Sequence, residues 1–226
     1  MSLHSVKVYS RFERFWHWTQ AFLIFSLFFT GFAIHGLHSL ISFKTAVVWH
    51  TWGAFTLIIL WIFAIFWHLT TGTWRHYLPT HQGLWQVFRF YSYGIFRAEP
   101  HPYRKAFWRK HNPLQALAYL SLKLVLFPLI WLTGLAYFTY QYWREWLPNA
   151  LMTFEWIAVL HVGAAFLIVA FVLLHVYLLS TGHSFAAHVK PMITGFDEVD
   201  LTAAEAAYLQ ESKAVSVKPI SDSHSH

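Results

Sequence analysis

Four long runs of apolar residues, separated by polar connections, dominate the pattern along this chain. They cover about residues 15–34, 46–69, 114–140 and 151–179. A helix needs roughly 20 apolar residues to cross a hydrocarbon core about 30 Å thick, so each run is long enough to span a membrane. In lipid, a single segment satisfies its backbone polar groups only as a helix. The pattern therefore predicts an all-α fold, an integral membrane four-helix bundle over residues 1–190.

The basic residues predict how this bundle is oriented. Of the 16 Lys and Arg residues, 13 lie before the first run, between the second and third, or after the fourth. By the positive-inside rule both termini, the connection 70–113 and a tail 191–226 are cytoplasmic. Within the connection, residues 83–95 mix aromatic residues with Arg89, which is typical of a helix in the membrane interface, although a plain surface loop fits nearly as well. The first run lacks a cleavage site of small residues, so we expect it to be retained as a helix.

The composition narrows the function classes. The chain is 57% hydrophobic and 12% charged, whereas a soluble domain carries about 25% charged residues, so a soluble enzyme is excluded. The net charge of +6 flanks the apolar runs and forms no basic domain, so we expect no nucleic-acid partner. Cysteine is absent, which excludes thiolate metal sites, iron–sulfur clusters and covalently attached c-type haem in this chain. The 16 histidines are the remaining unusual feature.

Histidines within the apolar runs fall at two depths. Ionisable residues at membrane depth are costly and usually functional. His161 and His175 are 14 residues apart, which places them on nearly the same face of one helix, about 21 Å from each other. One helix thus offers ligands to two stacked centres, each of which needs a partner from another helix. By depth, His17 matches His175 at the cytoplasmic level, and His50 matches His161 at the outer level.

Paired imidazoles without nearby carboxylates or thiolates are typical of axial ligands to a haem iron. A zinc site would need a third or fourth protein ligand at each level. A haem also needs flat space against the helix backbones, which four glycines are spaced to provide: Gly31, Gly53, Gly134 and Gly163. His68, 18 residues after His50 and on the same face, remains an alternative to His17 as the inner ligand. His35 and His38 are weaker alternatives at the outer level.

Four segments of the chain resemble a known family. RFERFWHW, VVWHTWGAF, LHVGAAFLIVAFVLLHVY and KHNPLQ resemble the membrane cytochrome b subunits of formate dehydrogenases and thiosulfate reductases. These belong with prokaryotic dihaem cytochromes related to cytochrome b561 and with hydrogenase b-type subunits, and the resemblance extends over about residues 8–179. It implies two haem b groups, with the inner haem iron held by His17 and His175 and the outer haem iron by His50 and His161. It also implies that His68 is not a ligand.

The resemblance further implies a quinone site beside the cytoplasmic haem. The asparagine of HNPLQ, Asn112, would help to bind menaquinone or ubiquinone, and His111 and Gln115 could add hydrogen bonds and a proton route from cytoplasmic water. A simpler interpretation is a helix start, with Asn112 as N-cap and Pro113 at the first helical position. Both interpretations are compatible.

These observations predict an electron-transfer subunit of a quinone-linked oxidoreductase complex in the bacterial inner membrane. It would carry electrons between an extracytoplasmic redox partner and a membrane quinone, and no active site of its own is expected beyond the quinone site. The family implies a molybdoenzyme or iron–sulfur subunit, a hydrogenase or a multihaem cytochrome c as partner, docking on connections 35–45 and 141–153. The alternatives are a metal or proton transporter lined by histidines and a membrane anchor without a redox role.

Overall fold

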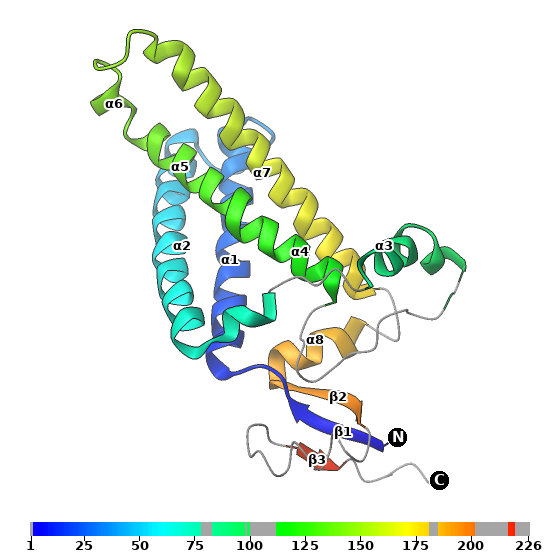
Figure 1. Ribbon diagram of the computed structural model, residues 1–226. Helices are drawn as coiled ribbons and strands as arrows, with labels where there is room; N and C mark the ends of the chain where they lie inside the picture. The colour runs from blue at the N-terminus through cyan, green and yellow to red at the C-terminus, as the bar shows by residue number, and fades with distance from the viewer. Residues whose placement is uncertain are drawn as a thin grey trace. The chain divides into compact units, whose positions relative to one another are not determined.

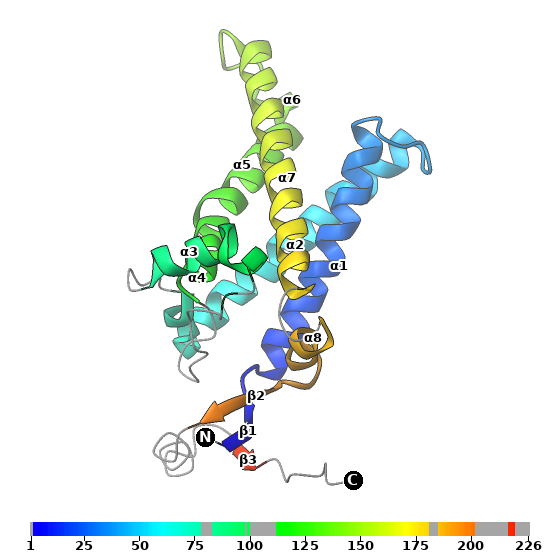
Figure 2. The ribbon, with the colours of Figure 1, turned by 90° about the vertical axis from the view of Figure 1, so that its right-hand side faces the viewer.

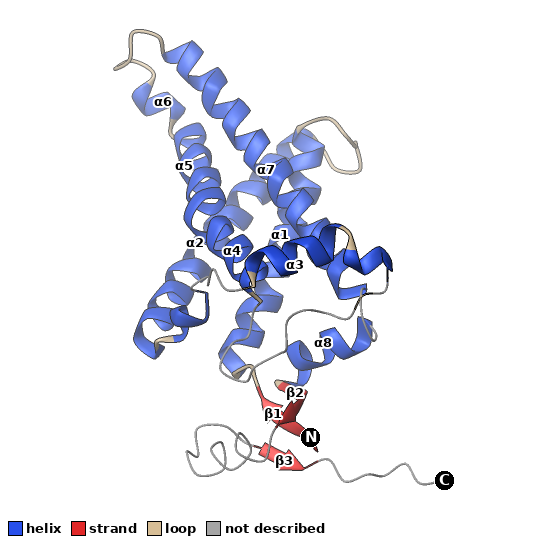
Figure 3. Cartoon of the chain, turned by 45° about the vertical axis from the view of Figure 1, so that its right-hand side comes forward, coloured by secondary structure: helices blue, strands red, loops and turns tan. Residues whose placement is uncertain are grey.

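The computed structural model describes residues 2–77, 83–97, 99, 112–180, 185–201 and 217–219. Within these ranges, four helices are long and apolar enough to cross a membrane: Arg11–Ile34, Phe43–Thr71, Pro113–Phe138 and Ala150–Ser180. The predicted class, an all-α membrane protein with four spans, is confirmed, and the expected span limits differ from the observed ones by a few residues. Figure 1 shows these helices, and Figure 3 shows that the strands are confined to segments near the two ends of the chain.

Three of the four spans are single helices, and the third is composite. The single helices are α1 (Arg11–Ile34), α2 (Phe43–Thr71) and α7 (Ala150–Ser180). The third consists of α4 (Pro113–Ser121), the π-helical turn η3 (Leu122–Leu126) and α5 (Phe127–Phe138). The remaining helical elements are η1 (Thr73–Tyr77), α3 (Leu84–Ser92), η2 (Gly94–Arg97), α6 (Tyr140–Trp143) and α8 (Phe185–Thr194). Within residues 83–95, Leu84–Ser92 form helix α3 and not a plain loop, and its predicted position in the membrane interface stays a prediction.

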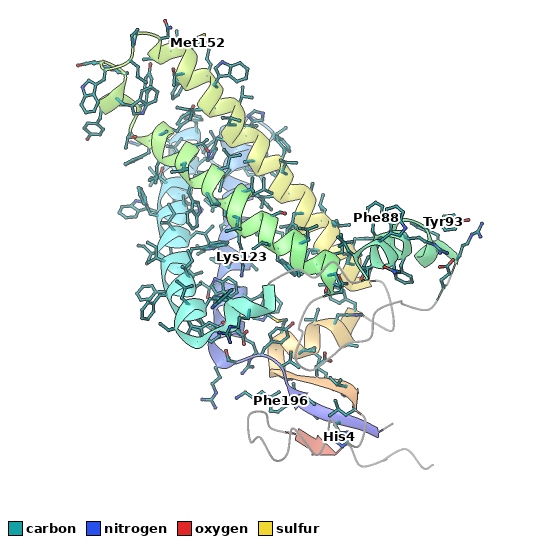
Figure 4. All side chains as sticks on the ribbon, in the orientation of Figure 1. His4, Phe88, Tyr93, Lys123, Met152 and Phe196 are labelled. Atoms are coloured by element: carbon teal, nitrogen blue, oxygen red, sulfur yellow. The ribbon has the colours of Figure 1, made fainter. Side chains whose placement is uncertain are left out.

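The π-helical turn has an identifiable cause in the sequence. Pro128 lacks a backbone N–H, and its ring would collide with the carbonyl of Leu124 in a regular α-helix. A π turn just before the proline relieves that collision, and such turns are frequent at functional sites. Lys123 lies in this turn, half-buried, and is labelled in Figure 4. The span predicted over residues 114–140 is observed as Pro113–Phe138, with a π turn in its interior and its end at Thr139, which has φ −93° and ψ 10°.

The chain divides into two compact units. One is drawn from Met1–Thr19, Pro79–Ala116 and Leu179–His226, and the other consists of Gln20–Leu78 and Leu117–Leu178. The second unit holds most of the four spans and is called the span unit below. The first holds the start of α1, the start of α4, the end of α7, and α3, η2, α8 and the three strands, and is called the terminal unit.

In the span unit, each of the four spans contributes to one buried apolar cluster. Its buried members are Leu23, Leu57, Trp61, Leu122, Phe127 and Ile168. The ring of Trp61 meets that of Phe127 edge to face, with 3.9 Å between ring centroids. Figures 1 and 2 both show α1 beside α2 and α5 beside α7. Large apolar side chains on the other faces of these helices are exposed, as expected of surfaces that contact lipid.

The terminal unit contains a three-stranded antiparallel sheet. Strand β1 (Ser2–Lys7) pairs on one side with β2 (Phe196–Leu201) and on the other with β3 (Val217–Pro219). Figure 4 labels His4 on β1 and Phe196 on β2. Because β1 precedes the first span and β2 follows the fourth, this pairing agrees with an even number of spans. The predicted boundary at residue 190 falls inside α8, which continues through Pro191 and ends at Gly195 with φ +91°.

The start of α1 is fastened to the end of α8 within the terminal unit. Ser10 and Glu13 form a reciprocal capping pair at the first turn of α1, with distances of 2.8 Å and 3.2 Å between backbone N and side-chain O. Arg14 donates a hydrogen bond to the carbonyl of Ile193, and the Trp18 indole N–H donates to the carbonyl of Met192 at 2.9 Å. These contacts fix the segment of α1 that contains His17.

Candidate functional site

Two histidines face each other inside the span unit. His50 lies near the start of α2 and His161 in the first half of α7. Their ring centroids are 6.4 Å apart, and their ring planes make an angle of 67°. Both side chains are half-buried. The structure therefore brings together the outer pair that the depth argument predicted.

Each of these rings is held by a threonine from the preceding span. The Thr30 hydroxyl of α1 lies 3.0 Å from His50 Nδ1, and the Thr133 hydroxyl of α5 lies 3.1 Å from His161 Nδ1. Both threonines are buried, with 3% and 6% of their surface exposed. With Nδ1 engaged in both rings, Nε2 is the nitrogen directed away from the threonine. Sequence reasoning missed both threonines.

A glycine follows each threonine and lets the imidazole ring approach the helix backbone. A Cβ atom on Gly31 would lie 3.4 Å from His50 Cε1, and one on Gly134 would lie 3.2 Å from His161 Cε1. Two of the four glycines expected to leave space therefore border the imidazole rings directly. A Cβ on Gly53 would meet Leu27 at 3.4 Å, and one on Gly163 would have nothing within 4 Å.

The inner histidine of α7 has different neighbours. His175 Nδ1 lies 3.3 Å from the Tyr119 hydroxyl of α4, and its ring stacks with Phe171 at 6.2 Å between centroids and 10° between planes. Its predicted partner His17 belongs to the terminal unit, where its ring lies edge-on to Trp18 at 5.1 Å. The pairing of His17 with His175 stays a prediction.

The alternative histidines occupy distinct environments. His68 is buried, with 7% of its surface exposed, and its Nδ1 lies 2.6 Å from the carbonyl of Ala64 on its own helix. That bond directs Nε2 away from the helix backbone, so His68 remains an alternative inner ligand. His38 Nε2 lies 2.8 Å from the carbonyl of Phe29, so that nitrogen is bonded to the end of α1.

The predicted quinone residues form a helix cap in the terminal unit. The Gln115 N–H donates to Asn112 Oδ1 at 2.8 Å, and the Asn112 N–H donates to Gln115 Oε1 at 3.1 Å. The interpretation of Asn112 and Pro113 as a helix start is thus confirmed. His111 lies outside the described residues, and a quinone role for Asn112 and Gln115 stays a prediction.

Tyr91 of α3 joins this cap and was missed from the sequence. The Asn112 side-chain amide donates to the Tyr91 hydroxyl at 3.3 Å, and Asn112 itself is 6% exposed. Burial raises the pKa of Tyr91 above its ordinary value of 10.0, and the hydrogen bond from Asn112 partly offsets that rise. Twenty-one residues separate the two side chains, so no local pattern could have indicated their contact.

The outer pair fits an axially ligated metal centre. Two metal–nitrogen bonds of about 2 Å, with an imidazole ring beyond each, separate the ring centroids by roughly 6 Å, close to the separation seen here. No cluster of three or more His, Cys, Asp or Glu side chains suited to a metal ion occurs among the residues described. A tetrahedral zinc site needs such a cluster, whereas a porphyrin iron needs only two axial ligands. The donor set therefore fits haem.

Four spans with a facing histidine pair at membrane depth define a multi-pass membrane protein suited to a redox metal group. The family model for prokaryotic cytochrome b561 matches residues 8–195, and the chain belongs to that family. A relative described as "Putative cytochrome YdhU", from Escherichia coli (strain K12), is 30% identical over 197 residues, which cover 84% of this chain and 74% of that protein. The chain is therefore a membrane b-type cytochrome that binds haem and takes part in electron transfer.

Proposed function

We propose that this cytochrome carries electrons across the bacterial inner membrane, between an extracytoplasmic redox partner and a membrane quinone, through two stacked b-type haems. The observation that carries the proposal is the facing pair of His50 and His161, with each Nδ1 engaged by a buried hydroxyl. When bound, each haem supplies a one-electron Fe(III)/Fe(II) couple.

The outer haem is held by His50 and His161 through Nε2. A ligating histidine commonly directs its other ring nitrogen to a hydrogen-bond partner that fixes the ring, and Thr30 and Thr133 occupy that position.

The inner haem is held by His17 and His175. His175 follows His161 by 14 residues on the same uninterrupted helix, so the two sites are stacked about 21 Å apart along α7. Tyr119 engages His175 Nδ1, as the threonines engage the outer rings. Arg14 and Trp18, on either side of His17, donate hydrogen bonds to α8 and so hold the part of α1 that carries this proposed ligand.

The quinone is proposed to react at the cytoplasmic side, near Asn112, Gln115 and His111. Reduction of a quinone takes up protons as well as electrons, so its site needs polar groups close to water. Asn112, which is buried, and Tyr91, which is half-buried, supply polar atoms in the region that precedes the third span. The variant Asn112→Asp tests this proposal, because it changes the polar atoms offered at this position.

The orientation follows from the basic residues, which predict that both termini are cytoplasmic. The extracytoplasmic partner, a molybdoenzyme or iron–sulfur subunit, a hydrogenase or a multihaem cytochrome c, then docks on connections 35–45 and 141–153. Tyr142 and Trp146, 75% and 80% exposed, are available there for contact. A reporter fused within 141–153 should be extracytoplasmic and one after residue 226 cytoplasmic; the opposite result would invert the proposed relay.

Haem stoichiometry tests the ligand assignments. His161→Ala and His50→Ala should each leave one haem per chain and remove the same redox transition, whereas His175→Ala should remove the other transition. Haem is counted from its pyridine haemochrome, and the transitions are resolved by potentiometric titration. His68→Ala should retain two haems, and loss of the inner haem in this variant but not in His17→Ala would assign that ligand to His68. Two intact haems in both His161→Ala and His175→Ala would refute the proposal.

A further inference from the structure

The two outer histidines are held by the same local arrangement, built twice. The sequences FTGFA at residues 29–33 and LTGLA at residues 132–136 share a Thr-Gly pair and an Ala two positions after the glycine. In each copy the threonine hydroxyl meets a histidine Nδ1 and the glycine leaves space for the same ring. One copy lies on α1 and serves α2, and the other lies on α5 and serves α7.

The hydrogen bonds of the threonines determine which partner supplies the proton. A hydroxyl has a single proton to donate. Thr30 donates it to the carbonyl of Ser26 at 2.9 Å, and Thr133 donates it to the carbonyl of Leu129 at 2.6 Å. Both carbonyls belong to the same helix as the threonine and lie four residues earlier, so they act only as acceptors. Both contacts of each threonine can be hydrogen bonds at the same time only if the hydroxyl donates to the carbonyl and its oxygen accepts from the imidazole, and in that arrangement the Nδ1–H of each histidine is the donor.

We propose that Thr30 and Thr133 are positioning residues that hold both outer histidines as the Nδ1–H tautomer and so present the Nε2 lone pair to the iron. This inference rests on the proposed ligand role of His50 and His161. The threonines touch neither the iron nor a substrate, and they act through the imidazole rings. The paired arrangement makes both ligands of the outer haem alike.

The consequence is a specific effect on the haem. A hydrogen-bond acceptor at Nδ1–H raises the basicity of the ligating nitrogen and fixes the plane of the ring, and loss of such a partner typically lowers metal affinity by about 10- to 100-fold. A more basic ligand favours Fe(III) over Fe(II). Removal of the acceptor should therefore raise the reduction potential of the outer haem and leave the inner haem unchanged.

The test replaces the hydroxyl while keeping the shape of the side chain. Thr133→Val and Thr30→Val remove the acceptor, and Thr133→Ser and Thr30→Ser retain it. In purified protein, each valine variant should lower the preference of the outer iron for Fe(III) by about tenfold. This corresponds to a rise of about 59 mV in the reduction potential of the outer haem, a one-electron couple. Potentiometric titration measures this shift, and the low-spin ferric EPR signal of the outer haem should change with it. In the serine variants the reduction potential of the outer haem should change by less than about a third of that shift.

Thr56→Val is the matched control, because the Thr56 hydroxyl makes the same bond to a carbonyl four residues earlier, that of Trp52 at 2.8 Å, on an exposed face. It should leave the outer haem unchanged. Loss of the outer haem in Thr133→Val but not in Thr133→Ser also supports the proposal. An unchanged potential and EPR signal in haem-loaded valine variants, equal loss of haem in the valine and serine variants, or an equal shift in Thr56→Val would overturn it.

Haem content and potential, measured in purified His161→Ala and Thr133→Val, distinguish failure of this inference from failure of the proposed function. If His161→Ala retains the outer haem, the ligand assignment itself is wrong. If His161→Ala loses that haem and Thr133→Val changes nothing, the ligands stand and only the positioning role fails.

Discussion

The two histidines of α7 lie on one helix, yet their surroundings differ. The His161 ring lies between a buried threonine and a glycine of α5, and its partner His50 has the same pair of neighbours on α1. The His175 ring instead meets the hydroxyl of Tyr119 at 3.3 Å and stacks on Phe171. The outer level is thus built twice from one short sequence, whereas at the inner level a tyrosine hydroxyl and a phenylalanine ring contact His175.

This difference matches what each level has to do in the proposed relay. The outer level only passes electrons, so fixed rings and matched ligands are sufficient. In the proposed relay the inner haem exchanges electrons with a quinone, whose reduction also takes up protons, and the predicted ligand His17 belongs to the terminal unit together with Asn112 and Tyr91. The contrast predicts that small steric changes will damage the outer haem selectively, and that polar changes near Asn112 will alter quinone chemistry without haem loss.

The largest expected effect comes from filling the glycine space at the outer level. Gly134→Val would place its Cβ at 3.2 Å from His161 Cε1, with two further methyl groups that have to displace the ring. The outer haem content should fall at least tenfold, equivalent to about 1.4 kcal/mol or more of binding free energy, while the inner haem is retained. Pyridine haemochrome analysis and redox titration measure both sites. Gly31→Val should act in the same direction.

Two comparisons sharpen this prediction. Gly134→Ala should cost more outer haem than Gly31→Ala, because the corresponding Cβ contact is 3.2 Å at Gly134 and 3.4 Å at Gly31. Leu135→Val introduces the same valine one residue further along α5, at an exposed position, and should leave both haems in place. Full outer haem in Gly134→Val would show that this glycine space is dispensable.

The features predicted correctly from the sequence are those set by membrane thickness and helix periodicity. An apolar run of sufficient length has to be a helix in lipid, and residues at matched depths on neighbouring spans can meet when their helix faces are turned toward each other. For this reason the four spans and the meeting of His50 with His161 were predictable. The helix start at Asn112 and Pro113 was also predictable, because capping is a local property.

The features that were missed depend on side-chain detail or on distant contacts. The π turn before Pro128 was not predicted, because a proline in a membrane helix is accommodated in several ways. The pairing of β1 with β2 joins segments from opposite ends of the chain, and SLHSVK has no regular alternation of apolar and polar residues that would have indicated a strand. The roles of Thr30 and Thr133 had a visible signal in the repeated Thr-Gly pair, which becomes meaningful only when each copy is placed beside a histidine.

A smaller effect is expected at the inner level, on quinone chemistry alone. Asn112→Asp keeps the cap, because an aspartate oxygen accepts the Gln115 N–H as the amide oxygen does. It replaces the amide donor now directed to Tyr91 by a negative charge, and the proposed quinone reduction would develop negative charge at the same site. Both haems should bind, and reoxidation of the reduced haems by a soluble quinone should slow about tenfold, or about 1.4 kcal/mol in activation free energy. Stopped-flow absorbance measures that rate.

The control for this variant is Gln86→Glu, which adds the same charge to the exposed face of α3, the helix that carries Tyr91. It should leave the reoxidation rate unchanged. If Asn112→Asp, loaded with both haems, were reoxidised at the parent rate, Asn112 would serve only as a helix cap and the quinone site would lie elsewhere.

The smallest expected effect is at Tyr119, and it tests whether the two levels really differ in how firmly their rings are held. The Tyr119 hydroxyl lies 3.3 Å from His175 Nδ1, longer than the 3.0 Å and 3.1 Å of the threonine contacts and near the upper limit of a useful hydrogen bond. Tyr119→Phe removes this hydroxyl and keeps the ring, which packs edge to face against Phe171. The inner haem should remain bound, with a shift in its reduction potential less than half of that caused by Thr133→Val at the outer haem.

Tyr137→Phe, which removes an exposed hydroxyl from α5, is the control and should shift the reduction potential of neither haem. If Tyr119→Phe shifted the inner potential as far as Thr133→Val shifts the outer one, both levels would rely equally on a hydroxyl at Nδ1, and the weaker hold inferred from the longer contact would be wrong.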